Sequence, residues 1–400
     1  MEHISDRIQA LAPSATLAMS QMSSELKAQG IDVVNLSVGE PDFATPQHIK
    51  QAAKDAIDTD CTFYTAVPGY LSLREAIADK LARENELHYD VSQIVVGNGA
   101  KHELCNVVMS VVNPGDEVVI PMPAWVSYVQ MVILAGGKPV TIEAPLEQGF
   151  KITASQLEAA ITARTRLLML CSPSNPTGAV YTRDELAALA DVLERHPNVM
   201  ILSDEIYEHI NYVGHHESIG QFHSISDRVI VINGVSKAYA MTGWRIGYMA
   251  GPLWLARAVS KLQGQYTSGV SSIAQKAAEA AYRSSQDCVE QMRQAFERRR
   301  DLVVSLLQEQ VPQLQLLTPD GAFYVFPRVT ALLGLTTPSG SVIADDNDLA
   351  MYLLREAHVA TVAGSAFGAP GYLRLSYATS DDNLREAVKR IAVAVNALKQ

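Results

Sequence analysis

Short, almost continuous apolar runs recur along the chain, and each ends in a polar loop. Runs without polar alternation are typical of strands that are covered on both faces. Helical spacing appears between them, as in residues 182–194, which open with the Thr182 and Glu185 pair of a capping box. This alternation predicts an α/β fold with a mostly parallel central sheet flanked by helices. The strands that we expect cover residues 94–96, 167–170, 199–202 and 229–232.

The pattern changes after residue 285, where a long helix is predicted for residues 285–308. Two later strands, over residues 321–326 and 372–377, and a closing helix predict a smaller α+β domain. A chain of 400 residues exceeds the usual size of a single core. No Gly/Ser linker marks a boundary. The predicted units are a large domain of residues 47–290, a small domain of residues 291–400 and an N-terminal segment of residues 1–46 that packs on the small domain.

Composition narrows the possible partners. With 32 Lys and Arg against 43 Asp and Glu, the net charge is −11, which argues against nucleic acid and anionic membranes as partners. No apolar run reaches the ~18 residues of a membrane span. The four cysteines show no paired spacing, and the first residues do not resemble a signal peptide. We therefore expect a cytoplasmic protein without disulfides.

Unusual polar residues follow the predicted strands, at the edge where open α/β sheets bind ligands. Lys237 follows one strand, and its amine could form an imine if burial kept it neutral. Asp204 follows another and could face a cationic ring nitrogen, or it could be a helix N-cap. Asn175 could present its amide to a ligand oxygen, or it could belong to a plain turn. Each residue alone is ambiguous.

The loop of residues 97–101 lies between a strand and a helix, so its backbone amides could hold a phosphate. A dinucleotide site would need a third glycine at position 102, which is His102. A nicotinamide-dependent dehydrogenase is therefore disfavoured. The adjacent pair His215 and His216 supplies too few ligands for a metal, and we predict no metal site.

Two further features have open alternatives. Trp125 and Tyr128 could stack on a planar ligand or simply pack in the core. Arg374 lies inside an apolar strand and needs a partner for its charge. A ligand carboxylate held by two parallel hydrogen bonds and an internal Asp or Glu are equally good candidates.

Five motifs together resemble the fold-type I pyridoxal-phosphate aminotransferases of class I, in particular the bacterial aspartate aminotransferase subgroup that includes aspartate/prephenate enzymes. The motifs occur in the family's order, and the resemblance spans essentially the whole chain. They are SVGEPDF at residues 37–43, NPTGAVY at 175–181, SDEIYE at 203–208, SKAYAMTGWRIGY at 236–248 and RLSYAT at 374–379.

The resemblance implies pyridoxal 5′-phosphate as cofactor and gives the residues their roles. Lys237 would form the internal aldimine and later move a proton between the substrate Cα and the cofactor C4′. Asp204 would keep the pyridine nitrogen protonated. Asn175 and Tyr207 would hydrogen-bond the ring oxygen, and Trp125 would stack on the ring.

The resemblance also implies the phosphate and substrate contacts. Gly234 departs from the family, because many relatives carry a phosphate-binding serine there. Tyr64 would reach in from a second subunit, which requires a homodimer with shared active sites. The phosphate contacts are the amides of Gly99, Ala100 and Lys101, the side chains of Ser236 and Arg245, and Tyr64. Arg374, helped by Gly39 and Asn175, would take the substrate α-carboxylate, while Trp125, Lys101 and hydroxyls near Ser14 and Thr16 would contact the rest of an acidic substrate.

The expected reaction is ping-pong transamination of L-aspartate and 2-oxoglutarate to oxaloacetate and L-glutamate. An aromatic amino acid or prephenate is the alternative substrate within the family. A lyase or synthase could use the same lysine, because fold alone does not fix the reaction. A pyridoxal-phosphate-binding regulator would need a fused DNA-binding domain, for which the 400 residues leave no room.

Overall fold

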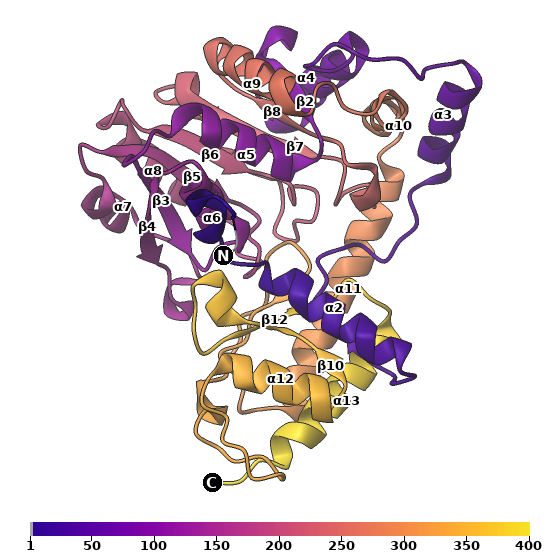
Figure 1. The fold of residues 1–400 in the computed structure, drawn as a ribbon, viewed down its shortest axis with the longest axis vertical. Coiled ribbons are helices and arrows are strands. Elements are labelled where there is room, and N and C mark those ends of the chain that lie inside the picture. Colours follow the sequence, from indigo (N-terminus) through magenta and orange to yellow (C-terminus); the bar gives the residue numbers. More distant parts are fainter. Residues whose placement is uncertain (1–2) are drawn as a thin grey trace.

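The computed structural model describes residues 3–400 and contains one large sheet of seven strands, in the order β2-β8-β7-β6-β5-β3-β4 (Figure 1). Neighbouring strands are parallel except that β8 is antiparallel to β2 and to β7. The mostly parallel sheet predicted from the sequence is confirmed. The strands are β2 (Ile94–Gly97), β3 (Glu117–Met122), β4 (Lys138–Glu143), β5 (Thr165–Cys171), β6 (Met200–Asp204), β7 (Val229–Gly234) and β8 (Gly247–Ala250).

Helices cover both faces of this sheet, as the buried apolar runs require. Successive side chains of a strand point to opposite faces of the sheet, so they pack in different hydrophobic cores. In β5, Leu167 belongs to one core and Leu168 to the other. One face carries α5 (Ala100–Val111), α6 (Ser127–Leu134) and α9 (Leu253–Tyr266). The other carries α3 (Gln47–Asp58), α4 (Leu71–Asn85), α7 (Ala154–Ala160), α8 (Arg183–Glu194) and α10 (Ser272–Arg283). The predicted capping box at the start of α8 is present.

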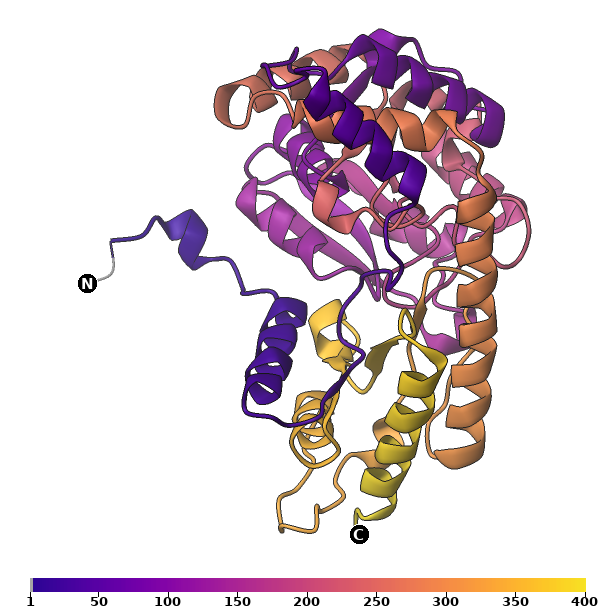
Figure 2. The same ribbon diagram turned by 90° about the vertical axis from the view of Figure 1, so that its right-hand side faces the viewer.

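A smaller layer lies beside the large sheet and contains segments from both ends of the chain (Figure 2). It contains a three-stranded sheet in the order β11-β12-β9 and a pair formed by β1 and β10. The long helix α11 runs from one layer to the other, and the N-terminal helix α2 contacts β10 and β11. The elements of this layer are α2 (Ala15–Ala28), β1 (Val34–Asn35), α11 (Asp287–Gln310), β9 (Tyr324–Val325), α12 (Asp346–Glu356), β10 (Val359–Ala360), β11 (Val362–Ala363), β12 (Leu373–Ser376) and α13 (Asp381–Asn396). The short helix α1 (Asp6–Gln9) contacts α6 on the large sheet.

The strand expected over residues 321–326 is shorter in the structure, where only Tyr324–Val325 is paired as a strand. The amide of Gly321 donates instead to the Gly178 carbonyl at 2.8 Å, and that of Ala322 to the Ile210 carbonyl at 2.7 Å. These bonds tie the segment to loops of the large sheet. The predicted boundary at residues 290/291 falls within α11, and the three-part division stays a prediction.

Within residues 3–400, no helix has the length and apolar character that crossing a membrane demands.

Candidate active site

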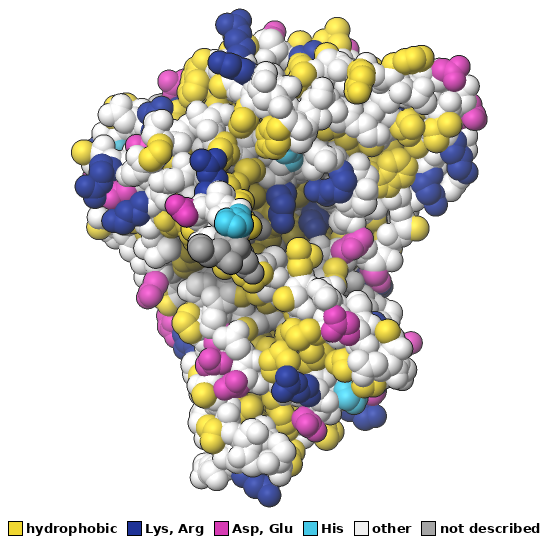
Figure 3. All heavy atoms as spheres, in the orientation of Figure 1, with side chains coloured by type: hydrophobic (Ala, Val, Ile, Leu, Met, Phe, Trp, Pro, Cys, Tyr) yellow, Lys and Arg dark blue, Asp and Glu magenta, His cyan; other side chains and the backbone are white. Residues whose placement is uncertain are grey.

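Most of the predicted site residues line one cavity of about 310 Å³ between the large sheet and the smaller layer. It lies beyond the carboxyl ends of the parallel strands, where α/β folds bind ligands. Lys and Arg side chains gather around a hollow between the layers (Figure 3). The predicted residues in the lining are Gly39, Ala100, Lys101, Trp125, Asn175, Asp204, Tyr207, Ser236, Lys237, Arg245 and Arg374. Gly99 adjoins the cavity beside Arg245, and Tyr64 lies outside it.

Lys237 lies in the turn after β7 and is held by the chain's N-terminal part. Its Nζ donates to the Gly39 carbonyl at 2.5 Å and lies 5.7 Å from the centre of the Tyr207 ring. Burial lowers the pKa of Lys237 to about 8, although the charge of Glu40 opposes this shift. The neutral, nucleophilic amine is therefore far more accessible here than in a solvated lysine.

Asp204 ends β6 and is 3% exposed. It accepts a hydrogen bond from the Tyr128 hydroxyl at 2.6 Å and a longer one from the Ile206 amide at 3.3 Å. Burial raises the pKa of Asp204 to about 6, and these two bonds limit the rise, so the carboxyl is mostly ionised at neutral pH. Residues 206–209 form turns, so the alternative of a helix N-cap is wrong. A buried anion that faces a cavity suits a cationic ligand atom.

Arg374 is 2% exposed in β12, and its charge has no acidic partner among the described residues. Its guanidinium donates to Asn175 Oδ1 at 3.0 Å and to the Ser37 carbonyl, and it stacks 4.5 Å from the Tyr324 ring centre. The Nε–H has no hydrogen-bond partner. The internal Asp or Glu that sequence reasoning kept open is therefore absent from residues 3–400. A buried guanidinium in this state is suited to bind an anionic ligand.

The start of α5 provides an anion cradle. Gly99 is its N-cap with φ of +89°, which favours glycine. In the described structure the amides of Ala100 and Lys101 make no hydrogen bond, whereas the Gly99 amide already donates to the Gly97 carbonyl at 2.8 Å. Arg245 lies against Gly99. A phosphate could bind here, because two free amides, a helix N-terminus and a guanidinium all attract an anion.

Gly234, where the sequence departs from the family's serine, lies close against the neighbouring backbone. A Cβ at this position would lie 2.7 Å from the Ile246 carbonyl oxygen and 2.7 Å from Gly247 Cα, both in the backbone beside β7. We expect Gly234→Ser to lower the free energy of unfolding by about 1–3 kcal/mol, because β8 must move. At Gly243 a Cβ meets nothing within 4 Å. Urea unfolding of Gly234→Ser should therefore differ from that of Gly243→Ser, and equal stability of the two variants would contradict this account.

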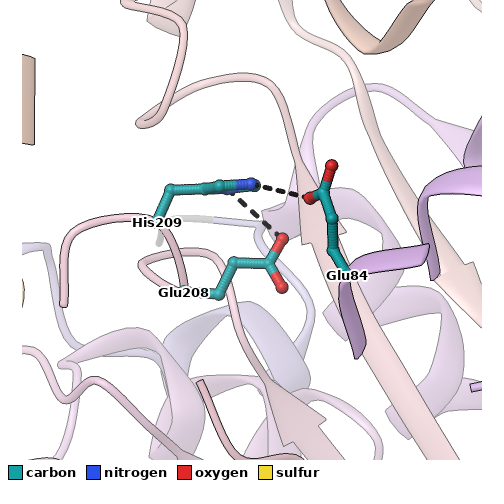
Figure 4. Close-up of side chains that lie close together, drawn as sticks. All are labelled: Glu84, Glu208 and His209. Carbon is teal, nitrogen blue, oxygen red and sulfur yellow. Dashed lines mark hydrogen bonds and ion pairs between the residues drawn. The ribbon is translucent and has the colours of Figure 1, made fainter. Parts of the chain in front are cut away.

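A buried polar cluster behind the cavity was not foreseen from the sequence. Glu208 forms an ion pair with Lys80 and accepts from Asn85 Nδ2 at 2.6 Å. His209 bridges Glu208 at 3.4 Å and Glu84 at 3.0 Å (Figure 4). Burial alone would raise the pKa of Glu208, but Lys80 and the nearby histidines lower it well below its usual range. The positive charge of Lys80 balances the charge of these carboxylates. The cluster holds α4 against the turn after β6.

The cavity fits pyridoxal phosphate on the chemistry of its own residues. An amine with a lowered pKa can bond to an aldehyde carbon, whose oxygen leaves as water. A buried carboxylate can pair with a protonated ring nitrogen. The cradle at α5 matches a phosphate. Trp125 supplies an aromatic wall, with Lys101 Nζ 4.8 Å above its ring.

Comparisons with known proteins agree with this chemistry. The sequence model of the family "Aminotransferase class I and II" matches residues 31–391. An "Aspartate/prephenate aminotransferase" of Cereibacter sphaeroides is 51% identical over 393 residues, covering 98% of each chain. An "Aspartate aminotransferase" of Rhizobium meliloti is 47% identical, covering 98% of this chain and 96% of the other.

Solved structures give the same result. The crystal structure of the aspartate aminotransferase from Rhizobium meliloti superposes with a TM-score of 0.96 at 46% identity, over 100% of both chains. The Thermus thermophilus aspartate aminotransferase, solved with maleate, gives 0.92 at 42% identity, over 98% of this chain and all of the other. The fold predicted from the motifs is confirmed. The chain belongs to the class I and II aminotransferases, which depend on pyridoxal phosphate.

Proposed function

We propose that this aminotransferase exchanges the amino group between L-aspartate and 2-oxoglutarate, giving oxaloacetate and L-glutamate. The observation that carries the proposal is the shared cavity of Lys237, Asp204 and Arg374: an amine with a lowered pKa, a buried anion and a guanidinium without an acidic partner. The relatives from Cereibacter and Rhizobium are named for aspartate, which supports aspartate as a substrate.

The residues have distinct tasks in this proposal. Pyridoxal phosphate, when bound, supplies an electron-poor ring that stabilises negative charge at the substrate Cα. Lys237 Nζ would bond to the cofactor's aldehyde carbon, whose oxygen would leave as water, and once displaced by the substrate amine it would move the proton at the substrate Cα. Asp204 would pair with the ring nitrogen. Asn175 and Tyr207 would hold the ring oxygen, and Trp125 would pack on the ring face.

The substrate's two carboxylates would bind at opposite sides of the cavity. Arg374 takes the α-carboxylate, beside Asn175 and the backbone of Gly39. Lys101 extends over Trp125 into the cavity, which Thr16 also lines. Ser14 Oγ lies 3.0 Å from Thr16 Oγ1, so these hydroxyls are available near the same wall. We infer that this side receives the distal carboxylate and so favours acidic amino acids.

A panel of amino donors tests the substrate. With 2-oxoglutarate as acceptor, we expect kcat/KM for aspartate to exceed those for alanine and phenylalanine by about tenfold or more, since only aspartate offers a second carboxylate. Prephenate is the acceptor to compare with 2-oxoglutarate, because the Cereibacter relative is named an aspartate/prephenate aminotransferase. A preference for phenylalanine would contradict an acidic-substrate site, and absence of any half-reaction would contradict transamination.

We infer a homodimer in which Tyr64 completes the partner's phosphate site. Tyr64 is 99% exposed and Phe63 78% exposed in the single chain, and such side chains suit an interface. We expect sedimentation to give a dimer and Tyr64→Phe to weaken cofactor binding. A monomer with full cofactor affinity would contradict this inference.

Four free cysteines support a cytoplasmic location, which cell fractionation would test.

A further inference from the structure

We propose that Tyr128 is a positioning residue, which holds the Asp204 carboxylate in the orientation that the cofactor's ring nitrogen requires. This inference rests on the proposed function, because it concerns how the chain receives pyridoxal phosphate. Tyr128 lies in the first turn of α6 and is 1% exposed. Its hydroxyl donates to Asp204 Oδ2 at 2.6 Å.

No other side chain in residues 3–400 donates a hydrogen bond to this carboxylate. Its second bond, from the Ile206 amide to Oδ1, is longer at 3.3 Å. Cys171 neighbours Asp204 across β5 and β6, but its thiol donates to the Pro173 carbonyl at 3.4 Å. The phenol therefore provides the one short bond that fixes how the two carboxylate oxygens point.

Tyr128 acts as a permanent donor. Burial, together with the charge of Asp204, raises the pKa of Tyr128 well above its ordinary value, so its proton stays on the phenol. Its ring also packs edge-on against Trp125, with centres 5.6 Å apart and planes at 88°. Tyr128, at the start of α6, thus positions both Trp125 and Asp204 in the lining of the cavity.

Removal of the hydroxyl leaves Oδ2 of Asp204 buried without a partner. The carboxyl then turns toward another donor or takes up a proton, and a neutral acid pairs poorly with a protonated ring nitrogen. Because the aromatic ring is kept, Tyr128→Phe preserves the packing against Trp125. The loss is confined to a ligand that carries a ring N–H.

The test measures binding to the cofactor-free chain by fluorescence titration. We expect Tyr128→Phe to bind pyridoxal phosphate about tenfold more weakly than wild type, the usual effect of one hydrogen bond to a charged group. An analogue with carbon in place of the ring nitrogen should bind both proteins equally. In an Asp204→Asn background, Tyr128→Phe should cause no further loss, because the two residues act as one unit.

Tyr352→Phe is the matched control. Tyr352 is another buried phenol, and it donates to the Ala394 carbonyl at 3.0 Å in the smaller layer. This variant should keep wild-type affinity for pyridoxal phosphate, and thermal unfolding of both variants checks that they fold. Unchanged affinity in Tyr128→Phe, or equal weakening for the cofactor and the carbon analogue, would overturn the positioning role alone. Failure of the wild-type chain to bind pyridoxal phosphate would overturn the proposed function as well.

Discussion

Replacement of Lys237 with Ala is expected to lower kcat/KM for aspartate by at least about 10⁴-fold, because one amine serves both as cofactor anchor and as proton carrier. Lys101 is the other lysine among the described residues that line the cavity, and its Nζ lies over the Trp125 ring, 4.8 Å from the ring centre. Half-reactions with aspartate, followed by absorbance of the bound cofactor, measure the loss. The visible band of the cofactor joined to an amine should disappear in the variant.

Chemical trapping locates the attachment. Borohydride reduction of the wild-type protein with cofactor should add the cofactor's mass to the peptide that contains Lys237. Burial lowers the pKa of this amine to about 8, so the rate of cofactor capture should rise as the pH increases through about 8. An unperturbed lysine would show this rise only near 10.4. The direction follows because the proton must leave before the amine can attack.

Lys389→Ala provides the control for the loss of a lysine. The Lys389 side chain is 72% exposed on α13, and its ion pair with Glu386 is long, at 3.7 Å. Activity and trapping should match wild type in this variant, since exposed pairs contribute little to stability. Substantial turnover in Lys237→Ala, or a trapped cofactor on another lysine, would contradict the assignment.

The sequence predicted four strands of the large sheet from their apolar runs, but it did not predict β3 and β8, which are also buried. Residues 229–232 of β7 are all buried, and they form an apolar run without a polar residue. The positions of the edge strand β4 are mostly exposed or half-buried, and its sequence therefore contains no such apolar run. The segment around Tyr324 looked like a longer strand than it is, because its backbone hydrogen bonds go to loops remote in sequence.

The site was predictable in part for a topological reason: parallel strands place the residues that follow them at one edge of the sheet. That rule brings Asp204 and Lys237 together without any knowledge of side-chain contacts. The bond between Tyr128 and Asp204 joins residues 76 positions apart, and that between Lys80 and Glu208 joins residues 128 apart. No local pattern encodes such pairs, because the packing of α6 and α4 on the sheet decides them.

Arg374 shows how structure separates two alternatives that the sequence leaves equal. Its guanidinium is buried, its neighbours Asn175 and the Ser37 carbonyl are uncharged, and its Nε–H is free. An isolated charge of this kind lowers stability and is retained where a ligand needs it. The binding of a carboxylate should therefore depend steeply on the guanidinium itself.

Arg374→Lys is expected to lower kcat/KM for aspartate by about 10³-fold, because an ammonium keeps the charge but cannot form two parallel hydrogen bonds to a carboxylate. β-Alanine, which is aspartate without the α-carboxylate, should react equally slowly with both proteins. Succinate should raise the melting temperature of wild type more than that of the variant. Arg390→Lys, on α13 and paired with Asp32, is the control. If Arg374→Lys kept kcat/KM within about threefold, a different residue would have to bind the α-carboxylate, since threefold is less than the value of one hydrogen bond to a charged group.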